Sequence, residues 1–126
     1  MPITYSIDPQ LGVIFEKWSG DVLASDLASY WRSYLADPEV IAIRKTVVDL
    51  RDSNPRFTGA ELADLINTIV LPVLAGRGWV TAIVVGKPVH VGVSRQYQVF
   101  AERYSRDAIF EEPEQALVWV QGISPS

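Results

Sequence analysis

The middle of the sequence holds a short apolar segment, Lys45-Thr46-Val47-Val48-Asp49-Leu50-Arg51, with β-branched residues at its centre. Such a run is typical of a strand in the interior of a sheet, covered on both faces. A second segment of this kind follows at Trp79-Val80-Thr81-Ala82-Ile83-Val84-Val85-Gly86. A helix is predicted between the two, because Thr58-Gly59-Ala60-Glu61 fits a capping box and apolar residues recur at helical spacing over 62–74. This order predicts parallel strands joined by a right-handed crossover.

The residues before this unit predict an antiparallel hairpin and a helix. Ile3-Thr4-Tyr5-Ser6-Ile7 alternates apolar and polar residues, and Val13–Trp18 is predicted as its partner strand. The turn residues Asp8-Pro9-Gln10-Leu11-Gly12 connect the two strands. Ser25 is expected to cap the next helix. Asp37-Pro38 is expected to end it, because the residue before a proline avoids the helical region.

The remaining residues complete an α/β domain. We predict a helix over 89–104, a short strand over 107–110 and a last helix that Glu112-Pro113-Glu114 opens. Pro72 should kink the middle helix, because proline lacks a backbone donor. The chain is therefore predicted as one domain over 1–126, with a mixed sheet of about five strands. Its element order is β-β-α-β-α-β-α-β-α, with helices packed on the sheet.

The composition excludes several classes of chemistry. The 126 residues include no cysteine and one histidine, His90, so thiolate catalysis, disulfides and multi-histidine metal sites are ruled out. Eleven basic against fifteen acidic residues give a net charge of −4, which argues against a nucleic-acid surface. We expect no cofactor, no metal and no membrane insertion, because the apolar runs are too short to span a bilayer. No targeting segment precedes Ile3, so a cytoplasmic protein is expected.

Six segments, taken in order, carry a resemblance to a known family. They are Ile3-Thr4-Tyr5 with Asp8-Pro9, then Gly20, Asp37-Pro38, Val48-Asp49-Leu50-Arg51, Gly92-Val93-Ser94-Arg95-Gln96-Tyr97-Gln98 and Phe110–Val120. Their order and spacing resemble the SpoIIAA-like family of the STAS/CRAL-TRIO-like fold group. The resemblance covers almost the whole chain. It implies a STAS-like sheet of four or five strands and a non-catalytic regulatory or ligand-binding role.

The resemblance also points to a phosphorylation site. Bacterial anti-sigma-factor antagonists of this group are phosphorylated on a Ser or Thr at the start of the second helix. The corresponding stretch here is Arg56-Phe57-Thr58-Gly59, so Thr58 and the nearby Ser53 are the candidate hydroxyls. The family's Asp and paired Ser are absent, which leaves no clear phosphorylation motif. Alternatively, Thr58 is simply the cap of a helix, since threonine is a favoured cap in any helix.

Polar residues follow the two predicted central strands and suggest an anion site. Asp49 and Arg51 lie at the end of the first strand, and Lys87, His90 and Arg95 follow the second. Ligands of open α/β sheets bind beyond the carboxyl ends of the strands, and a helix start favours anions. These five residues are therefore the candidate ligand-binding site. In the structural alternative, Arg95 pairs with Asp49 or Asp52, and His90 is a surface or capping residue.

Large apolar residues recur on the first helix. They are Leu27, Tyr30, Trp31, Tyr34 and Leu35. A stripe this wide predicts either an uncovered patch, of which a homodimer interface is the simplest use, or a wide core face.

We therefore carry three functional hypotheses. The first is a non-enzymatic regulatory or protein-interaction module that self-associates. The second is a binding protein for a small anionic or lipid-like ligand in an apolar cavity between the second and third helices, bordered by Lys87, His90 and Arg95. The third, least favoured, is an enzyme that uses His90 as its acid or base.

Overall fold

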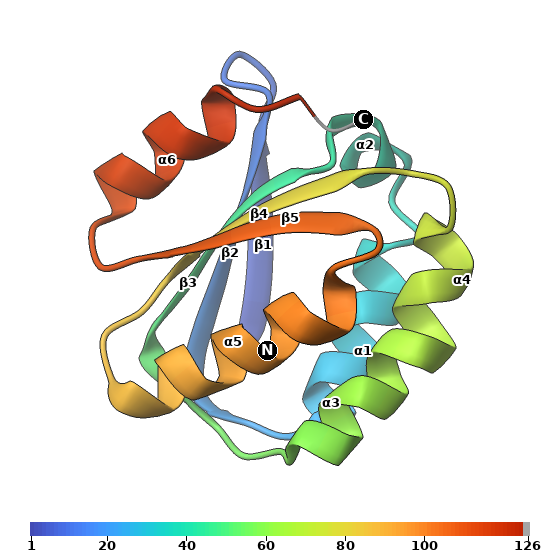
Figure 1. The fold of residues 1–126 in the computed structure, drawn as a ribbon, viewed down its shortest axis with the longest axis vertical. Helices are drawn as coiled ribbons and strands as arrows, with labels where there is room; N and C mark the ends of the chain where they lie inside the picture. Colours follow the sequence, from blue (N-terminus) through green and yellow to red (C-terminus); the bar gives the residue numbers. More distant parts are fainter. Residues whose placement is uncertain (125–126) are drawn as a thin grey trace.

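The computed structural model describes residues 1–124 and contains one five-stranded mixed sheet (Figure 1). The strands are β1 (Ile3–Asp8), β2 (Val13–Val22), β3 (Lys45–Pro55), β4 (Trp79–Val84) and β5 (Ser105–Phe110). Their order across the sheet is their order along the chain. β1 pairs antiparallel with β2, and all other pairs are parallel. The predicted mixed sheet is confirmed.

Helices cover both faces of the sheet unequally. One face carries α1 (Ala24–Tyr34), α3 (Gly59–Leu65), the π-helical turn η1 (Ile66–Val70), α4 (Leu71–Leu74) and α5 (Pro88–Ala101). The other face carries α6 (Pro113–Gln121), which packs on β3, β4 and β5 (Figure 1). We call these the helical face and the outer face of the sheet.

The central strands follow the alternation of a doubly covered sheet. On β3, Val48 and Leu50 contact the helical-face core, whereas Val47 contacts the core under α6. Every residue of β4 is buried. The prediction that these two strands lie in the interior of the sheet is confirmed.

Two helix boundaries differ from the prediction. Ser25 is not the cap of α1; instead the carboxylate of Asp26 accepts the N–H of Leu23 at 2.9 Å. Asp37-Pro38 ends α1 but also starts an additional short helix, α2 (Pro38–Ile43). Asp37 caps α2, accepting the Glu39 N–H at 2.9 Å, and Pro38 occupies the first turn, where no N–H is required.

The middle helix is disturbed before Pro72, as predicted. It divides into α3, η1 and α4, with the π turn directly preceding the residue pair Leu71-Pro72. Proline removes one helical hydrogen bond and crowds the carbonyl four residues earlier, and a wider turn relieves that crowding.

The aromatic stripe of α1 lies in the core. Leu27 is fully buried, and Tyr30, Trp31, Tyr34 and Leu35 are between 3% and 9% exposed. Of the two alternatives for this stripe, the wide core face is therefore confirmed and the uncovered patch is wrong, because the twisted sheet together with α3 and η1 covers its whole width.

Candidate functional site

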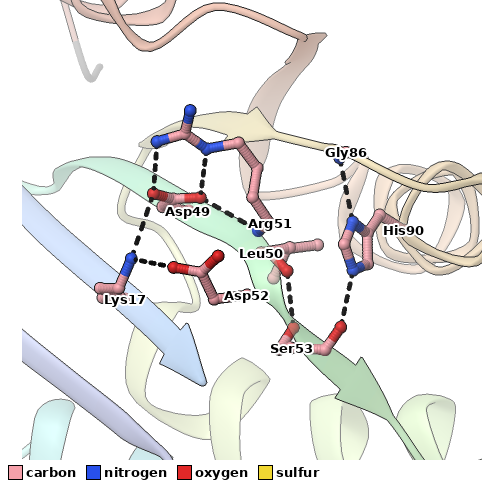
Figure 2. A network of polar contacts seen from close by, with 8 residues as sticks. All are labelled: Lys17, Asp49, Leu50, Arg51, Asp52, Ser53, Gly86 and His90. Atoms are coloured by element: carbon pink, nitrogen blue, oxygen red, sulfur yellow. Dashed lines mark hydrogen bonds and ion pairs between the residues drawn. The ribbon is translucent and has the colours of Figure 1, made fainter. Parts of the chain in front are cut away.

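The predicted anion site is occupied by ion pairs within the chain. Figure 2 shows Arg51 donating from Nε and Nη2 to the two carboxylate oxygens of Asp49, each at 3.0 Å. The Lys17 Nζ atom lies 3.7 Å from Asp49 Oδ2 and 2.8 Å from Asp52 Oδ2. Partial burial acts to raise the pKa of Asp49, but Arg51 and Lys17 together hold it below its usual value. These charges satisfy one another on the outer face.

His90 joins α5 to the end of β3. Its side chain is fully buried. Nδ1 accepts the N–H of Gly86 at 3.0 Å, and Nε2 donates to the Ser53 carbonyl at 2.8 Å (Figure 2). Nδ1 also accepts the N–H of Lys87 at 3.2 Å. The capping role is confirmed and the surface location is wrong. Both ring nitrogens of His90 are therefore engaged with backbone groups of the chain.

The other two basic residues of the predicted site, Lys87 and Arg95, lie in different surroundings. Lys87 donates to the Asn54 side chain at 2.8 Å, so the end of β3 and the loop after β4 converge, although Asn54 belongs to the strand and not to the predicted loop. Arg95 is exposed, and among residues 1–124 the partners of Asp49 and Asp52 are Arg51 and Lys17 instead. The predicted Arg95 pair is wrong. Arg95 follows His90 by five residues, which turns its side chain roughly 140° around the helix, away from the sheet.

The two candidate hydroxyls have structural partners. Ser53 is fully buried and donates to the Leu50 carbonyl at 2.8 Å. Thr58 is exposed and forms the predicted capping box: its Oγ1 accepts the Glu61 N–H at 3.1 Å, and its own N–H donates to Glu61 Oε1 at 2.9 Å. The capping interpretation of Thr58 is confirmed, whereas phosphorylation of Thr58 or Ser53 stays a prediction.

A cavity of about 80 Å³ lies between the helical face of the sheet and the helices that cover it. Its α5 wall is formed by Val93, Ser94 and Tyr97. The predicted cavity between the helix over 62–74, now α3 to α4, and the helix over 89–104, now α5, is therefore present. Its predicted border of Lys87, His90 and Arg95 is wrong, because the start of α5 lies beyond it. The other walls are formed by Glu16, Trp18, Leu27, Trp31, Tyr34, Leu35, Thr46, Val48, Leu50, Phe57, Leu62, Val70, Leu74, Trp79, Thr81 and Ile83.

One carboxyl group lies in this cavity wall. Glu16 of β2 is 6% exposed. Its Oε2 accepts from Trp18 Nε1 and its Oε1 accepts from the Tyr30 hydroxyl, both at 2.7 Å. Burial raises the pKa of Glu16 to about 7, although these two donors act in the opposite direction. No lysine, arginine or histidine is among the described residues that line the cavity.

Neutral polar groups complete the lining. Thr46 Oγ1 lies 2.7 Å from the Tyr34 hydroxyl and accepts from Trp79 Nε1 at 3.3 Å. Ser94 donates to the His90 carbonyl at 2.7 Å. Thr81 is 5% exposed, and its hydroxyl lies next to Tyr97 and the carboxyl of Asp107. The cavity thus combines an apolar, aromatic wall with a few buried polar atoms, as small-molecule sites do.

The sequence interpretation missed Glu16 although its pattern held a signal. Ile14, Glu16 and Trp18 occupy alternate positions of one strand, and both apolar members are buried. Side chains two residues apart share a face of the sheet, so a carboxyl between two core residues must itself face the core.

The outer face holds a separate, open groove of about 530 Å³ beside α6. Its walls include Phe15, Lys17, Asp49, Val84 and Leu117. The groove exists because α6 packs on β3, β4 and β5 and leaves the β1–β2 side uncovered.

Comparison with known proteins places the fold. No protein-family model and no curated protein matches this chain. A solved structure of an uncharacterized protein from the DUF3478 family of Shewanella loihica PV-4, with a SpoIIAA-like fold, is similar to it. The TM-score is 0.64 at 15% identity, over 94% of this chain and 93% of that one.

The fold is therefore SpoIIAA-like, as the resemblance of the sequence implied. At this identity the likeness describes the fold alone. Within residues 1–124, no helix is both long enough and apolar enough to cross a bilayer.

Proposed function

We propose that this protein is a non-enzymatic binding module that holds a small, largely apolar ligand in the cavity between the helices and the sheet. The observation that carries the proposal is the cavity itself, lined by aromatic rings and buried polar atoms. Protein interiors are close-packed, so a void of this size with polar groups in its wall calls for an occupant.

The dimensions limit that occupant. A cavity of about 150 Å³ holds benzene, so 80 Å³ suits a group of roughly four heavy atoms. This volume is too small for a long acyl chain, and the Glu16 carboxyl disfavours an anion. The proposal therefore replaces the anionic or lipid-like ligand expected from the sequence with a compact neutral or cationic one.

The cavity wall also contains the least regular helix of the fold. Val70 of η1 and Leu74 of α4 line the cavity on either side of Pro72. A π turn followed by proline leaves helical hydrogen bonds poorly formed, and such turns recur at functional sites. This segment is the part of the wall most easily displaced for entry.

Isopropanol tests the proposal, because its four heavy atoms match the size of the cavity. Trp18, Trp31 and Trp79 line the cavity, whereas Trp119 packs on the opposite face of the sheet with Phe110. Titration followed by NMR of the indole N–H groups should shift the three cavity tryptophans saturably and leave Trp119 unchanged. Equal shifts of all four, or no saturation, would contradict the proposal.

A matched pair of substitutions on α5 supplies the control. Val93 lines the cavity, whereas Val99 is 63% exposed on the same helix. Val93→Phe should fill the cavity and weaken isopropanol binding at least tenfold, and Val99→Phe should leave binding unchanged. Unaltered binding by the Val93→Phe variant would place the alcohol elsewhere.

The second candidate is a protein-interaction module that self-associates as a homodimer, as in the first hypothesis from the sequence. The observation that favours it is the open groove beside α6, where apolar Phe15 and Leu117 lie next to charged Lys17 and Asp49. Native mass spectrometry of the purified chain should then show a doubled mass. The mass of a single chain at tens of micromolar protein would contradict the homodimer.

A further inference from the structure

We propose that the ligand of the helical-face cavity is a small organic amine, bound as its ammonium ion with the Glu16 carboxylate as counter-ion. This inference rests on the proposed function and adds the chemical class of the ligand.

Glu16 has capacity for a further hydrogen-bond donor. A carboxylate offers about four lone-pair sites, and Trp18 and Tyr30 occupy one on each oxygen. Both of these donors are neutral. An ionised carboxylate in an apolar interior is costly unless a cation pairs with it, and the described lining residues include none. An ammonium group would supply the missing charge.

The rest of the cavity is suited to the same ion. Trp18, Trp31 and Trp79 contribute indole rings to its wall. Indole faces attract cations most strongly among the aromatic side chains. The buried Thr81 hydroxyl in the same wall has a lone pair to accept an ammonium N–H. A carboxylate, aromatic rings and a hydroxyl oxygen are together the groups that recognise an alkylammonium ion.

The protonation of Glu16 gives the proposal a pH dependence. The titratable groups around the cavity besides Glu16 are Tyr30 and Tyr34 of α1 and Tyr97 of α5, and burial raises the pKa of all three hydroxyls, so none titrates between pH 5.5 and 8. Asp107 of β5, whose pKa burial also raises to about 7, does not line the cavity. Simple alkylamines stay protonated over this range, because an alkylammonium resembles the lysine side chain, with a pKa of about 10.4. Among the described residues that line the cavity, Glu16 is the group that changes its charge over this range.

Three probes of four heavy atoms each test the inference: isopropylamine, isopropanol and acetate. At pH 8 the amine should bind at least tenfold more tightly than the alcohol, and acetate should bind most weakly. At pH 5.5 the preference for the amine should shrink severalfold. Equal binding of amine and alcohol at pH 8 would overturn the inference while leaving the proposed function intact. Failure of all three probes would overturn both.

Glu16→Gln provides the second test. It should reduce amine binding to the level of the alcohol, at least tenfold, without weakening the alcohol. Glu111→Gln removes the same charge from an exposed position before α6 and should change neither. A Glu16→Gln variant that still prefers the amine would overturn the inference. If that variant does not fold, the three probes and their pH dependence on the unaltered chain decide alone.

Discussion

Glu16 and Lys17 are adjacent residues of opposite charge that lie on opposite faces of the sheet. Glu16 faces the helices and is buried, whereas the Lys17 side chain faces the outer surface and is 52% exposed. The alternation of β2 decides which of the two charges loses its water. Lys17 therefore forms surface ion pairs that each stabilise the fold by at most about 1 kcal/mol. Glu16 lies in the apolar core, which disfavours its ionised form.

Thr58 gives a prediction at the scale of one residue. Thr58→Ala removes the acceptor for the Glu61 N–H and should lower the free energy of unfolding by about 1 kcal/mol. Thr58→Ser should retain most of that stability. Thr68→Ala is the matched control, because the exposed Thr68 hydroxyl bonds only to the Asp64 carbonyl within the helix. Urea denaturation measures all three, and a Thr58→Ala variant as stable as the Thr68→Ala variant would contradict the capping role.

Among the elements, α6 stands apart. It is the helix that covers the outer face, through Ala116 and Val120, both fully buried against Val47, Val80 and Val84. The helical face has several helices that support one another, whereas α6 is held chiefly by its contacts with the sheet. A defect in its buried stripe should therefore detach the whole helix.

Two neighbouring substitutions test the attachment of α6. Ala116→Asp places a carboxylate in the core and should lower the stability by roughly 3 kcal/mol or more. Gln115→Asp places the same group one residue earlier, on the exposed side, and should cost less than about 0.5 kcal/mol. Hydrogen exchange of β4 amides should accelerate in the first variant only. Similar stabilities of the two variants would show that α6 does not depend on this face.

For the whole molecule, buried acids determine how stability varies with pH. Burial raises the pKa of Glu16 from 4.5 to about 7 and that of Asp107 from 3.8 to about 7. Between these limits the folded chain holds protons that the unfolded chain has released. As the pH rises between these limits, each group therefore lowers the free energy of unfolding by about 1.4 kcal/mol per pH unit. The loss is complete once the pH exceeds the pKa of the group in the folded chain. The pKa values of Asp37 and Asp49 are lowered in the folded chain, so their ionised forms stabilise it. This stabilisation is lost only when the pH falls below their usual pKa values.

The free energy of unfolding should accordingly be several kcal/mol greater at pH 5 than at pH 8. Urea unfolding across this range measures the difference. Glu16→Gln should flatten part of the slope, whereas Glu111→Gln should leave it unchanged. Equal or greater stability at pH 8 would contradict the burial of ionisable acids in the core.

The sequence predicted the sheet well because hydrophobic alternation and helix signals are local. Lys45–Arg51 and Trp79–Gly86 are recognisable without knowledge of their neighbours, and so is the cap at Thr58. The site was harder, because it depends on which side chains meet. The sequence predicted that Asp49 binds a ligand or pairs with Arg95. Its partner is Arg51, which lies two residues away on the same strand. The alternation of β2 indicates that Glu16 faces the core, but its hydrogen bond with Tyr30 of α1 is known only from the folded chain.

The strand order has a consequence for how the chain is made. Each strand pairs with the one that precedes it, so the sheet can grow in the order in which residues leave the ribosome, without waiting for a distant partner. The helical face is covered progressively by α1, α3 and α5. The outer face must wait for residues 113–121, so Val47, Val80 and Val84 stay open to chaperones and to neighbouring nascent chains until translation has passed α6.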